Sequence, residues 1–277
     1  MLSTHAQRST ADRRAQAQAN AAEAARDQAR RDRRTRVVLG AAAGTAVLTV
    51  ALVVWLVLGR GGPQVEGISE LPDGVDVPSV SDVHGGIAFG ASGEAGSTSG
   101  DGAVRVDVYV DFLCPACAQL EAVNGADLES LRADGSATVV LHAISFLDAK
   151  SDGGSYSTRA AAAFAHVAEE SPAEAYEFQA ALFARQPAEG GVALTDEQIE
   201  SIALEVGVPA DVAGTIADER YRDFVGALTQ VAFGDPDLLD AQGRFTTPTI
   251  LVDGTVFEGD WSRPGELRAA VEAAAAG

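Results

Sequence analysis

Cysteine and basic side chains are scarce in this 277-residue chain. It has two cysteines, and its 20 Lys plus Arg stand against 40 Asp plus Glu, which gives a formal net charge of −20. Two cysteines exclude a small scaffold held by several disulfides, and alone they cannot supply the four ligands of a structural zinc site. The acidic balance argues against nucleic-acid binding, which needs a basic face. Because 47% of the residues are hydrophobic, the chain can still bury a core.

The charge is distributed unevenly along the chain. Residues 1–36 carry nine arginines and four acidic residues, a net of +5, whereas the rest carries 11 basic and 36 acidic residues, a net of −25. The second part begins with 22 uncharged residues, 37–58. About 20 apolar residues suffice to cross a bilayer as a helix. A cleaved signal peptide is the alternative, but its apolar part would span only about 7–15 residues and end at a small-residue cleavage site. The pattern predicts a retained transmembrane helix.

The flanking charges predict the orientation of this helix. The cluster RRDRRTR precedes it at residues 30–36, and only Arg60 follows closely. By the positive-inside rule, residues 1–36 are predicted to form a cytoplasmic basic tail, and the part of the chain after the helix is predicted to be extracytoplasmic at the cell membrane. Glycine and proline are dense after the apolar run, so residues 59–82 are predicted to be a flexible linker. The folded domain is predicted to span residues 83–277.

The sequence after the predicted linker indicates an α/β fold. Val104, Val106, Val108 and Val110 alternate with more polar residues, which indicates a strand, and a helical pattern follows before a second β-rich run at residues 137–146. This order predicts a βαβ unit with a parallel sheet. Helical periodicity then dominates a stretch of about residues 155–242. Strand signal returns at 249–252 and 255–257 around an Asp-Gly turn, and a helix closes the chain. The sheet is therefore predicted to be split by a helical insertion.

Three local expectations concern this part of the chain. Thr195 and Gln198 have the spacing of a helix-capping box. His142 lies in a predicted strand and is expected to be packed there. His166 falls on the side of its helix opposite Phe164, so it is expected to be solvated.

The sequence Cys114-Pro115-Ala116-Cys117 carries the chemistry. It stands between a predicted strand and a predicted helix, and the N-terminus of a helix offers free N–H groups and a positive dipole. Both favour a thiolate, so the pKa of Cys114 is expected to lie below that of a free cysteine. Pro115 suits the first helical turn, where its missing N–H is tolerated. In the expected mechanism the exposed sulfur of Cys114 forms a mixed disulfide with a client protein, and Cys117 resolves it.

Three other interpretations of the two cysteines stay open. They could be half of a zinc site, although there is no second cysteine pair and the four histidines show no ligand spacing. They could form an inert disulfide, although so small a loop adds little stability. They could be unrelated buried residues. The order of strand, motif and helix favours redox chemistry, with no metal and no external cofactor.

Two separated motifs resemble a known family. The stretch DFLCPACAQLE at residues 111–121, with TTPTI at residues 246–250, resembles the DsbA-like branch of the thioredoxin superfamily, and more narrowly its membrane-anchored bacterial members. The resemblance covers about residues 83–276. It implies a thioredoxin-like fold with a helical insertion, and a thiol:disulfide oxidoreductase whose cofactor is the cysteine pair itself.

The resemblance also implies roles for individual residues. Cys114 corresponds to the nucleophile and Cys117 to the resolving thiol, with Pro115 and Ala116 as the active-site dipeptide. Pro248 corresponds to a cis-proline facing the cysteines, and the backbone of Thr247 is expected to pair with an extended client segment.

Two departures from the family pattern concern electrostatics. Val108 stands where many relatives have a buried acid, and Asp107 and Asp111 are expected to face the other side of the strand. The dipeptide also lacks a histidine that would stabilise the thiolate. We therefore expect a less oxidising couple than in relatives with Cys-Pro-His-Cys.

The expected function is disulfide formation in exported proteins by a membrane-tethered enzyme. A reductase or isomerase of the same fold is the first alternative, and a non-catalytic anchored interaction module is the second. By analogy with the family, an oxidase would be recycled by a quinone-linked membrane protein, DsbB-like or vitamin K epoxide reductase-like. No nucleic-acid partner is expected.

Overall fold

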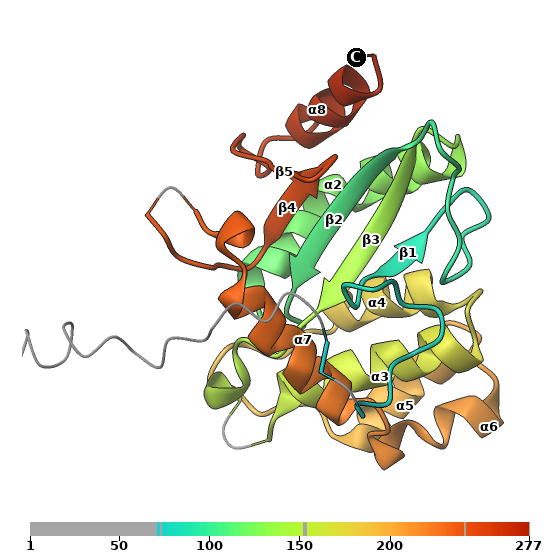
Figure 1. Cartoon of the computed structure of the whole chain (residues 1–277). Helices are drawn as coiled ribbons and strands as arrows, with labels where there is room; N and C mark the ends of the chain where they lie inside the picture. Colours follow the sequence, from blue (N-terminus) through green and yellow to red (C-terminus); the bar gives the residue numbers. More distant parts are fainter. Residues whose placement is uncertain (1–70, 73, 152–153, 241, 277) are drawn as a thin grey trace, which may run out of the picture. The chain divides into compact units, whose positions relative to one another are not determined.

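A mixed β-sheet forms the centre of the domain. The computed structural model describes residues 71–276 except 73, 152–153 and 241. In this part of the chain the sheet has five strands in the order β1-β3-β2-β4-β5 (Figure 1). The strands are β1 (Ile87–Phe89), β2 (Val104–Val110), β3 (Ala137–Ala143), β4 (Thr249–Val252) and β5 (Thr255–Val256). Only β2 and β3 are parallel, and the other neighbouring pairs are antiparallel.

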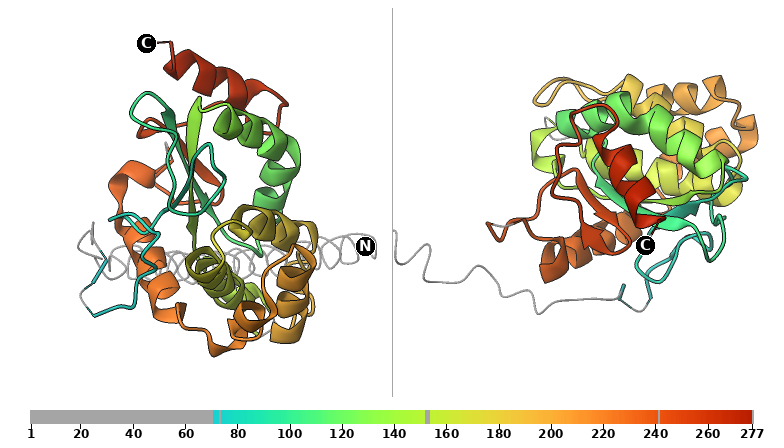
Figure 2. Two further views of the ribbon diagram at one scale, coloured as in Figure 1. Left: turned by 90° about the vertical axis from the view of Figure 1, so that its right-hand side faces the viewer. Right: turned by 90° about the horizontal axis from the view of Figure 1, so that it is seen from above.

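The predicted βαβ unit is confirmed as β2, α2 (Pro115–Ala133) and β3. β2 is central, because Val106 pairs with Val139 of β3 and with Val252 of β4. The apolar stripe of α2 packs on the sheet and includes Cys117 and Leu120. Figure 2 shows α2 on one face of the sheet and α7 (Arg222–Gly234) on the other. The chain therefore passes from the central strand β2 into a helix that covers one face of the sheet.

The helical insertion lies between β3 and β4, as predicted. Its α-helices group at the end of the sheet away from α8 (Glu266–Ala274) (Figure 1). They are α3 (Tyr156–Glu170), α4 (Ala175–Ala184), α5 (Asp196–Glu205), α6 (Ala210–Ala213) and α7, with short 3₁₀ turns at Asp148–Lys150, Ile216–Asp218 and Pro236–Leu238.

Helix α3 is the core of the insertion and is buried around most of its surface. It contacts α4, α5, α6 and α7, and Phe164 is fully buried. The expectation that His166 is solvated is therefore wrong. His166 is buried, and its Nε2 lies 2.9 Å from Thr215 Oγ1 and 3.1 Å from the carbonyl oxygen of Val212. A helix enclosed by others has no solvated face, whatever its periodicity.

The β4–β5 hairpin turns at Asp253 and Gly254, both with positive φ, as the Asp-Gly pair predicts. At the start of the described chain, the backbone N–H of Ser79 donates to Glu169, so the segment before residue 83 also packs on the domain. None of the helices in the described part has the length and apolar character needed to span a bilayer. The predicted tail and spanning helix, residues 1–58, lie outside the described residues.

Candidate active site

Cys114 occupies the N-cap position of α2. Its backbone is extended (φ −75°, ψ 115°), and Pro115 is the first helical residue. The Cys114 carbonyl accepts hydrogen bonds from the N–H groups of Cys117 (3.0 Å) and Ala118 (3.2 Å). This position places the sulfur of Cys114 over the free N–H groups of the first turn, where the helix carries partial positive charge.

The Cys114 sulfur is stabilised as a thiolate. A hydrogen bond from the Cys117 thiol, the side chain of Thr247 and the backbone N–H groups of Cys117 and Ala116 lower the pKa of Cys114 to about 6, against the opposing effect of burial. The sulfur–sulfur interaction is the largest cause. An ionised thiol is the form that attacks a disulfide, so Cys114 is a nucleophile at neutral pH.

The pKa values of the two cysteines are shifted in opposite directions. Burial raises the pKa of Cys117 well above the ordinary value, and the hydrogen bond it donates to Cys114 raises it further. Cys114 is 6% exposed and Cys117 is 1% exposed, and both are reduced in this structure. Cys114 was expected to be the exposed sulfur, but it keeps only a small opening because the segment around Thr247 covers it.

Thr247 and Pro248 lie beside Cys114 although about 130 residues separate them in the chain. The peptide bond between them is cis, and the Cys114 thiol donates to the Thr247 carbonyl oxygen (3.4 Å). The buried hydroxyl of Thr247 has no hydrogen-bond partner among the described residues. It is thus free to donate to the sulfur when Cys114 ionises, which agrees with its effect on the pKa.

Asp111 belongs to the site, contrary to expectation. It is fully buried, and its carboxylate accepts hydrogen bonds of 2.7 Å from the N–H of Leu113, the hydroxyl of Ser157 and the N–H of Leu147. Burial raises the pKa of Asp111 to about 6 despite these bonds, and the charge of Cys114 adds to the rise. The prediction failed because β2 ends at Val110, so strand alternation no longer sets the direction of residue 111.

Gln186 is a second residue that the sequence analysis missed. Its Nε2 donates to the carbonyl oxygens of Phe112 (2.8 Å) and Cys114 (3.0 Å). It follows α4, and nothing in its local sequence indicates a contact some 70 residues away. Together with Asp111 it holds the turn that carries Cys114.

Asp107 and His142 form a separate polar cluster. Asp107 Oδ1 lies 2.8 Å from Nε2 of His142 and also accepts from Arg105. His142 is buried, as predicted for a packed strand residue, and its ring stacks on Tyr109 with centroids 4.1 Å apart. Asp107 therefore points away from the cysteines, as expected.

The arrangement can exchange a disulfide. It pairs an ionised sulfur with a protonated one, beside the backbone segment of Thr247 and Pro248. In the described residues no three His, Cys, Asp or Glu side chains are grouped so that they could hold a metal ion.

Comparison with known proteins agrees with the fold and the site. A family model described as thioredoxin matches residues 97–273. Oxidised DsbA from Mycobacterium tuberculosis is 30% identical with a TM-score of 0.56, over 69% of this chain and 93% of that one. Reduced DsbG from the same organism is 26% identical with a TM-score of 0.53, over 76% and 91%. MdbA from Actinomyces oris, 22% identical with a TM-score of 0.56 over 76% and 99%, shows the fold.

A shorter likeness involves a larger protein. The serine/threonine-protein kinase PknE of M. tuberculosis is 33% identical over 106 residues, which are 37% of this chain. The match spans only 19% of that kinase.

Fold and site together define an enzyme of the DsbA-like thiol:disulfide oxidoreductase class, with a redox-active cysteine pair in place of an external cofactor. The chain belongs to the thioredoxin family.

Proposed function

We propose that this enzyme forms disulfides in exported proteins. The observation that carries the proposal is the ionised Cys114 at the start of α2, paired with the buried, protonated Cys117. A stabilised thiolate favours the reduced form of the enzyme, which makes its disulfide form a good oxidant.

The reaction proceeds through a mixed disulfide. A client thiolate attacks Cys114 of the Cys114–Cys117 disulfide, and Cys117 leaves as a thiolate that takes up a proton. A second client thiolate then attacks the client sulfur of the mixed disulfide and releases Cys114 as a thiolate. Two electrons pass to the enzyme, and the client gains one disulfide. The high pKa of Cys117 favours its protonation once it has left.

Thr247 and Pro248 position the client in this proposal. The carbonyl of Thr247 contacts the Cys114 sulfur, so an extended client segment that pairs with the Thr247 backbone brings its cysteine to the same place. Pro115 and Ala116 form the other side of the opening. Ala116 is half-buried and Pro115 is exposed, so neither side chain obstructs a client.

The redox state of the pair in living cells tests the direction of the reaction. An oxidase keeps Cys114 and Cys117 mainly as a disulfide, whereas a reductase or isomerase keeps them mainly as a dithiol. Thiol trapping in acid followed by a mass-tagging reagent measures this ratio. A predominantly reduced pair would refute the oxidase and support the alternative.

The charge pattern of the first 58 residues supports a membrane-tethered form with the active site outside the cytoplasm. The reduced enzyme then needs an electron acceptor, and we expect a quinone-linked membrane protein of the DsbB-like or vitamin K epoxide reductase-like kind. Protease digestion of intact spheroplasts tests the orientation. Protection of the C-terminal domain from the protease would contradict it.

A further inference from the structure

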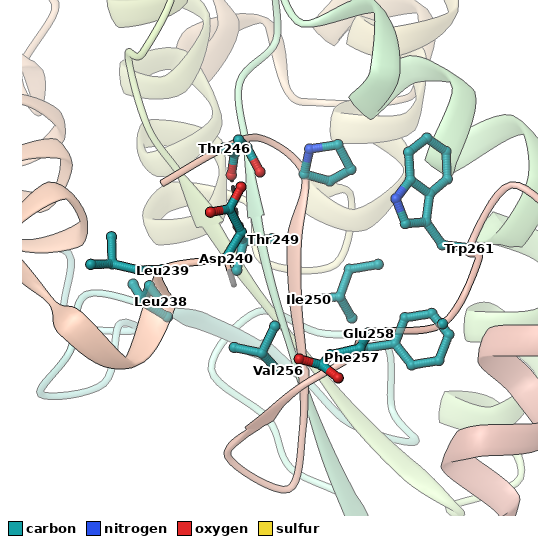
Figure 3. Close-up of a pocket in the computed structure, with 12 residues that line it drawn as sticks. Leu238, Leu239, Asp240, Thr246, Thr249, Ile250, Val256, Phe257, Glu258 and Trp261 are labelled. Carbon is teal, nitrogen blue, oxygen red and sulfur yellow. Dashed lines mark hydrogen bonds between the residues drawn. The ribbon is translucent and has the colours of Figure 1, made fainter. Parts of the chain in front are cut away.

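A cavity of about 460 Å³ adjoins the cis-proline segment. Figure 3 shows its walls, which come from the 3₁₀ turn after α7, the cis-proline segment, the β4–β5 hairpin and the loop before α8. The residues that line it are Leu238, Leu239, Asp240, Thr246, Pro248, Thr249, Ile250, Val256, Phe257, Glu258, Gly259 and Trp261.

The cavity lies next to the catalytic centre. Thr246 and Pro248 line it, and Thr247 between them contacts the sulfur of Cys114. Extended chain advances about 3.3 Å per residue. A client cysteine joined to Cys114 therefore places the side chains one to three residues away at the mouth of the cavity.

The inner wall of the cavity is apolar. Leu238 and Ile250 are buried at its base, while Val256, Phe257 and Trp261 are half-buried around it. In Figure 3 the Trp261 and Phe257 rings lie on one side of β4 and Leu239 on the other. When an apolar side chain of a client covers half-buried aromatic and aliphatic surface, apolar area is removed from water, and this stabilises the complex.

The rim of the cavity is acidic. Asp240 and the exposed Glu258 line it, and its lining, taken from the described residues, contains no Lys, Arg or His. Hydrogen bonds from the backbone and side chain of Arg244 hold the pKa of Asp240 below its usual range, so this carboxylate is charged at neutral pH.

Arg244 offsets the charge of Asp240, because its guanidinium forms an ion pair with that carboxylate. Arg244 is 3.0 Å from Asp240, and Arg263 is 3.1 Å from Asp260 and 3.9 Å from Glu266. Both guanidinium groups are therefore already paired with carboxylates. Glu258 is exposed, and among the described residues no ion pair joins it to a basic side chain, so its carboxylate is the charge at the rim that attracts a cation.

We propose that this cavity selects client segments in which an apolar side chain, followed by Lys or Arg, lies within a few residues of the reactive cysteine. The apolar side chain enters between Ile250, Phe257 and Trp261, and the basic group meets Glu258 at the rim. This inference rests on the proposed function and adds to it the substrate class.

Three synthetic peptides test the proposal with the oxidised, full-length protein. Each peptide has two cysteines and a leucine two residues after the first, and they differ only in the next residue, which is Lys, Gln or Glu. The rate of peptide oxidation is followed under single-turnover conditions, so that no other oxidant is needed. We expect the Lys peptide to react faster than the Glu peptide by about two- to fivefold, the range for an exposed ion pair.

Variants of Glu258 assign this preference to the cavity. Glu258→Gln is expected to reduce the Lys-to-Glu rate ratio and Glu258→Lys to invert it. The exposed Glu177 on α4 does not line the cavity, so Glu177→Gln and Glu177→Lys make the same charge changes elsewhere and should leave the ratio near that of the unmodified protein.

The outcomes distinguish failure of the client selection from failure of the proposed function. Equal rates for the three peptides, or a ratio that responds equally at residues 177 and 258, would overturn the selection while leaving the proposed function intact. If no peptide is oxidised although Cys114 and Cys117 start as a disulfide, the proposed function fails and the inference fails with it.

Discussion

At the scale of single residues, Asp111 anchors the turn that carries the sulfurs. It is a fully buried carboxyl that binds three segments: the active-site turn through Leu113, the loop after β3 through Leu147, and α3 through Ser157. The high pKa of Cys117 comes first from burial and then from its hydrogen bond to Cys114, and the charge of Asp111 is a minor addition. A buried acid is thus present near the cysteines, but it comes from the turn after β2 and not from the strand position of Val108.

We predict that Asp111→Asn changes the pH dependence of stability. Because the folded pKa of about 6 exceeds the unfolded value, this carboxyl stabilises the fold below about pH 4, and the contribution is lost as the pH rises through 6. Between about pH 4 and pH 6, the free energy of unfolding of the variant should therefore rise relative to that of the unmodified protein by up to about 3 kcal/mol. Urea unfolding of the reduced proteins measures the difference. A difference that does not vary with pH would contradict this account.

The dipeptide between the cysteines should tune the oxidising power. The pKa of about 6 for Cys114 lies between about 7 in thioredoxin and about 3.5 in a strongly oxidising DsbA. A histidine at position 116 would place a cation next to the thiolate, because Ala116 is in the first turn of α2.

We therefore predict that Ala116→His shifts the equilibrium with glutathione towards the reduced enzyme by about tenfold, which corresponds to about 30 mV. Ala116→Gln, which adds a polar side chain without a charge, is the matched control. Equal potentials for the His and Gln variants would show that charge at this position is not the cause.

At the scale of elements, strands and helices with clear periodicity were predicted well. The alternating valines of β2, the apolar stripe of α2 and the Asp-Gly hairpin all occur as the sequence indicates. The side-chain surroundings of His166 were not predictable, because they depend on which helices surround α3. A periodic pattern identifies the most apolar face of a helix. It does not show whether the other faces are also buried, as they are in a helix at the centre of a bundle.

The N-terminus of α5 offers a local test of the fold. Thr195 and Gln198 form the predicted capping box, in which each side chain accepts a hydrogen bond from the backbone of the other. We predict that Thr195→Ala lowers the free energy of unfolding by about 1 kcal/mol, because an N–H of the first turn loses its partner. Thermal unfolding checks this value. Thr195→Ser keeps the hydroxyl and should restore most of the loss, whereas equal losses in both variants would contradict the capping role.

At the scale of the whole molecule, the site is assembled from distant segments. The two motifs resemble a family in which they meet, and the structure brings Thr247 and Pro248 to Cys114. Sequence reasoning missed Gln186, because its contact with the active-site turn depends on how the end of α4 packs beside α2. The acidic rim was also missed, since its carboxylates become neighbours only when the segment after α7 and the loop before α8 fold onto β4.

The Cys117→Ala variant tests whether the assembled molecule acts on clients. Without Cys117, the Cys114 thiolate can still attack a disulfide in a client, which gives a mixed disulfide and one free client thiol. Release of the client through Cys117 is no longer possible, so adducts should accumulate. Non-reducing gels of cells that express the variant should show reducible high-mass bands that contain exported proteins. The double variant Cys114→Ser, Cys117→Ala is the control and should show none. A variant that is expressed normally but forms no adducts would favour a non-catalytic interaction module.

The central claim is that Cys114 is an accessible thiolate near neutral pH. The rate of Cys114 alkylation by iodoacetamide, followed from pH 4 to 9 in the reduced full-length protein, tests it most directly. The low pKa predicts a rise centred at about pH 6, with Cys117 unmodified throughout. A rise centred near the value for a free cysteine, about 8.5, or a Cys114 that remains unmodified at every pH, would contradict the account.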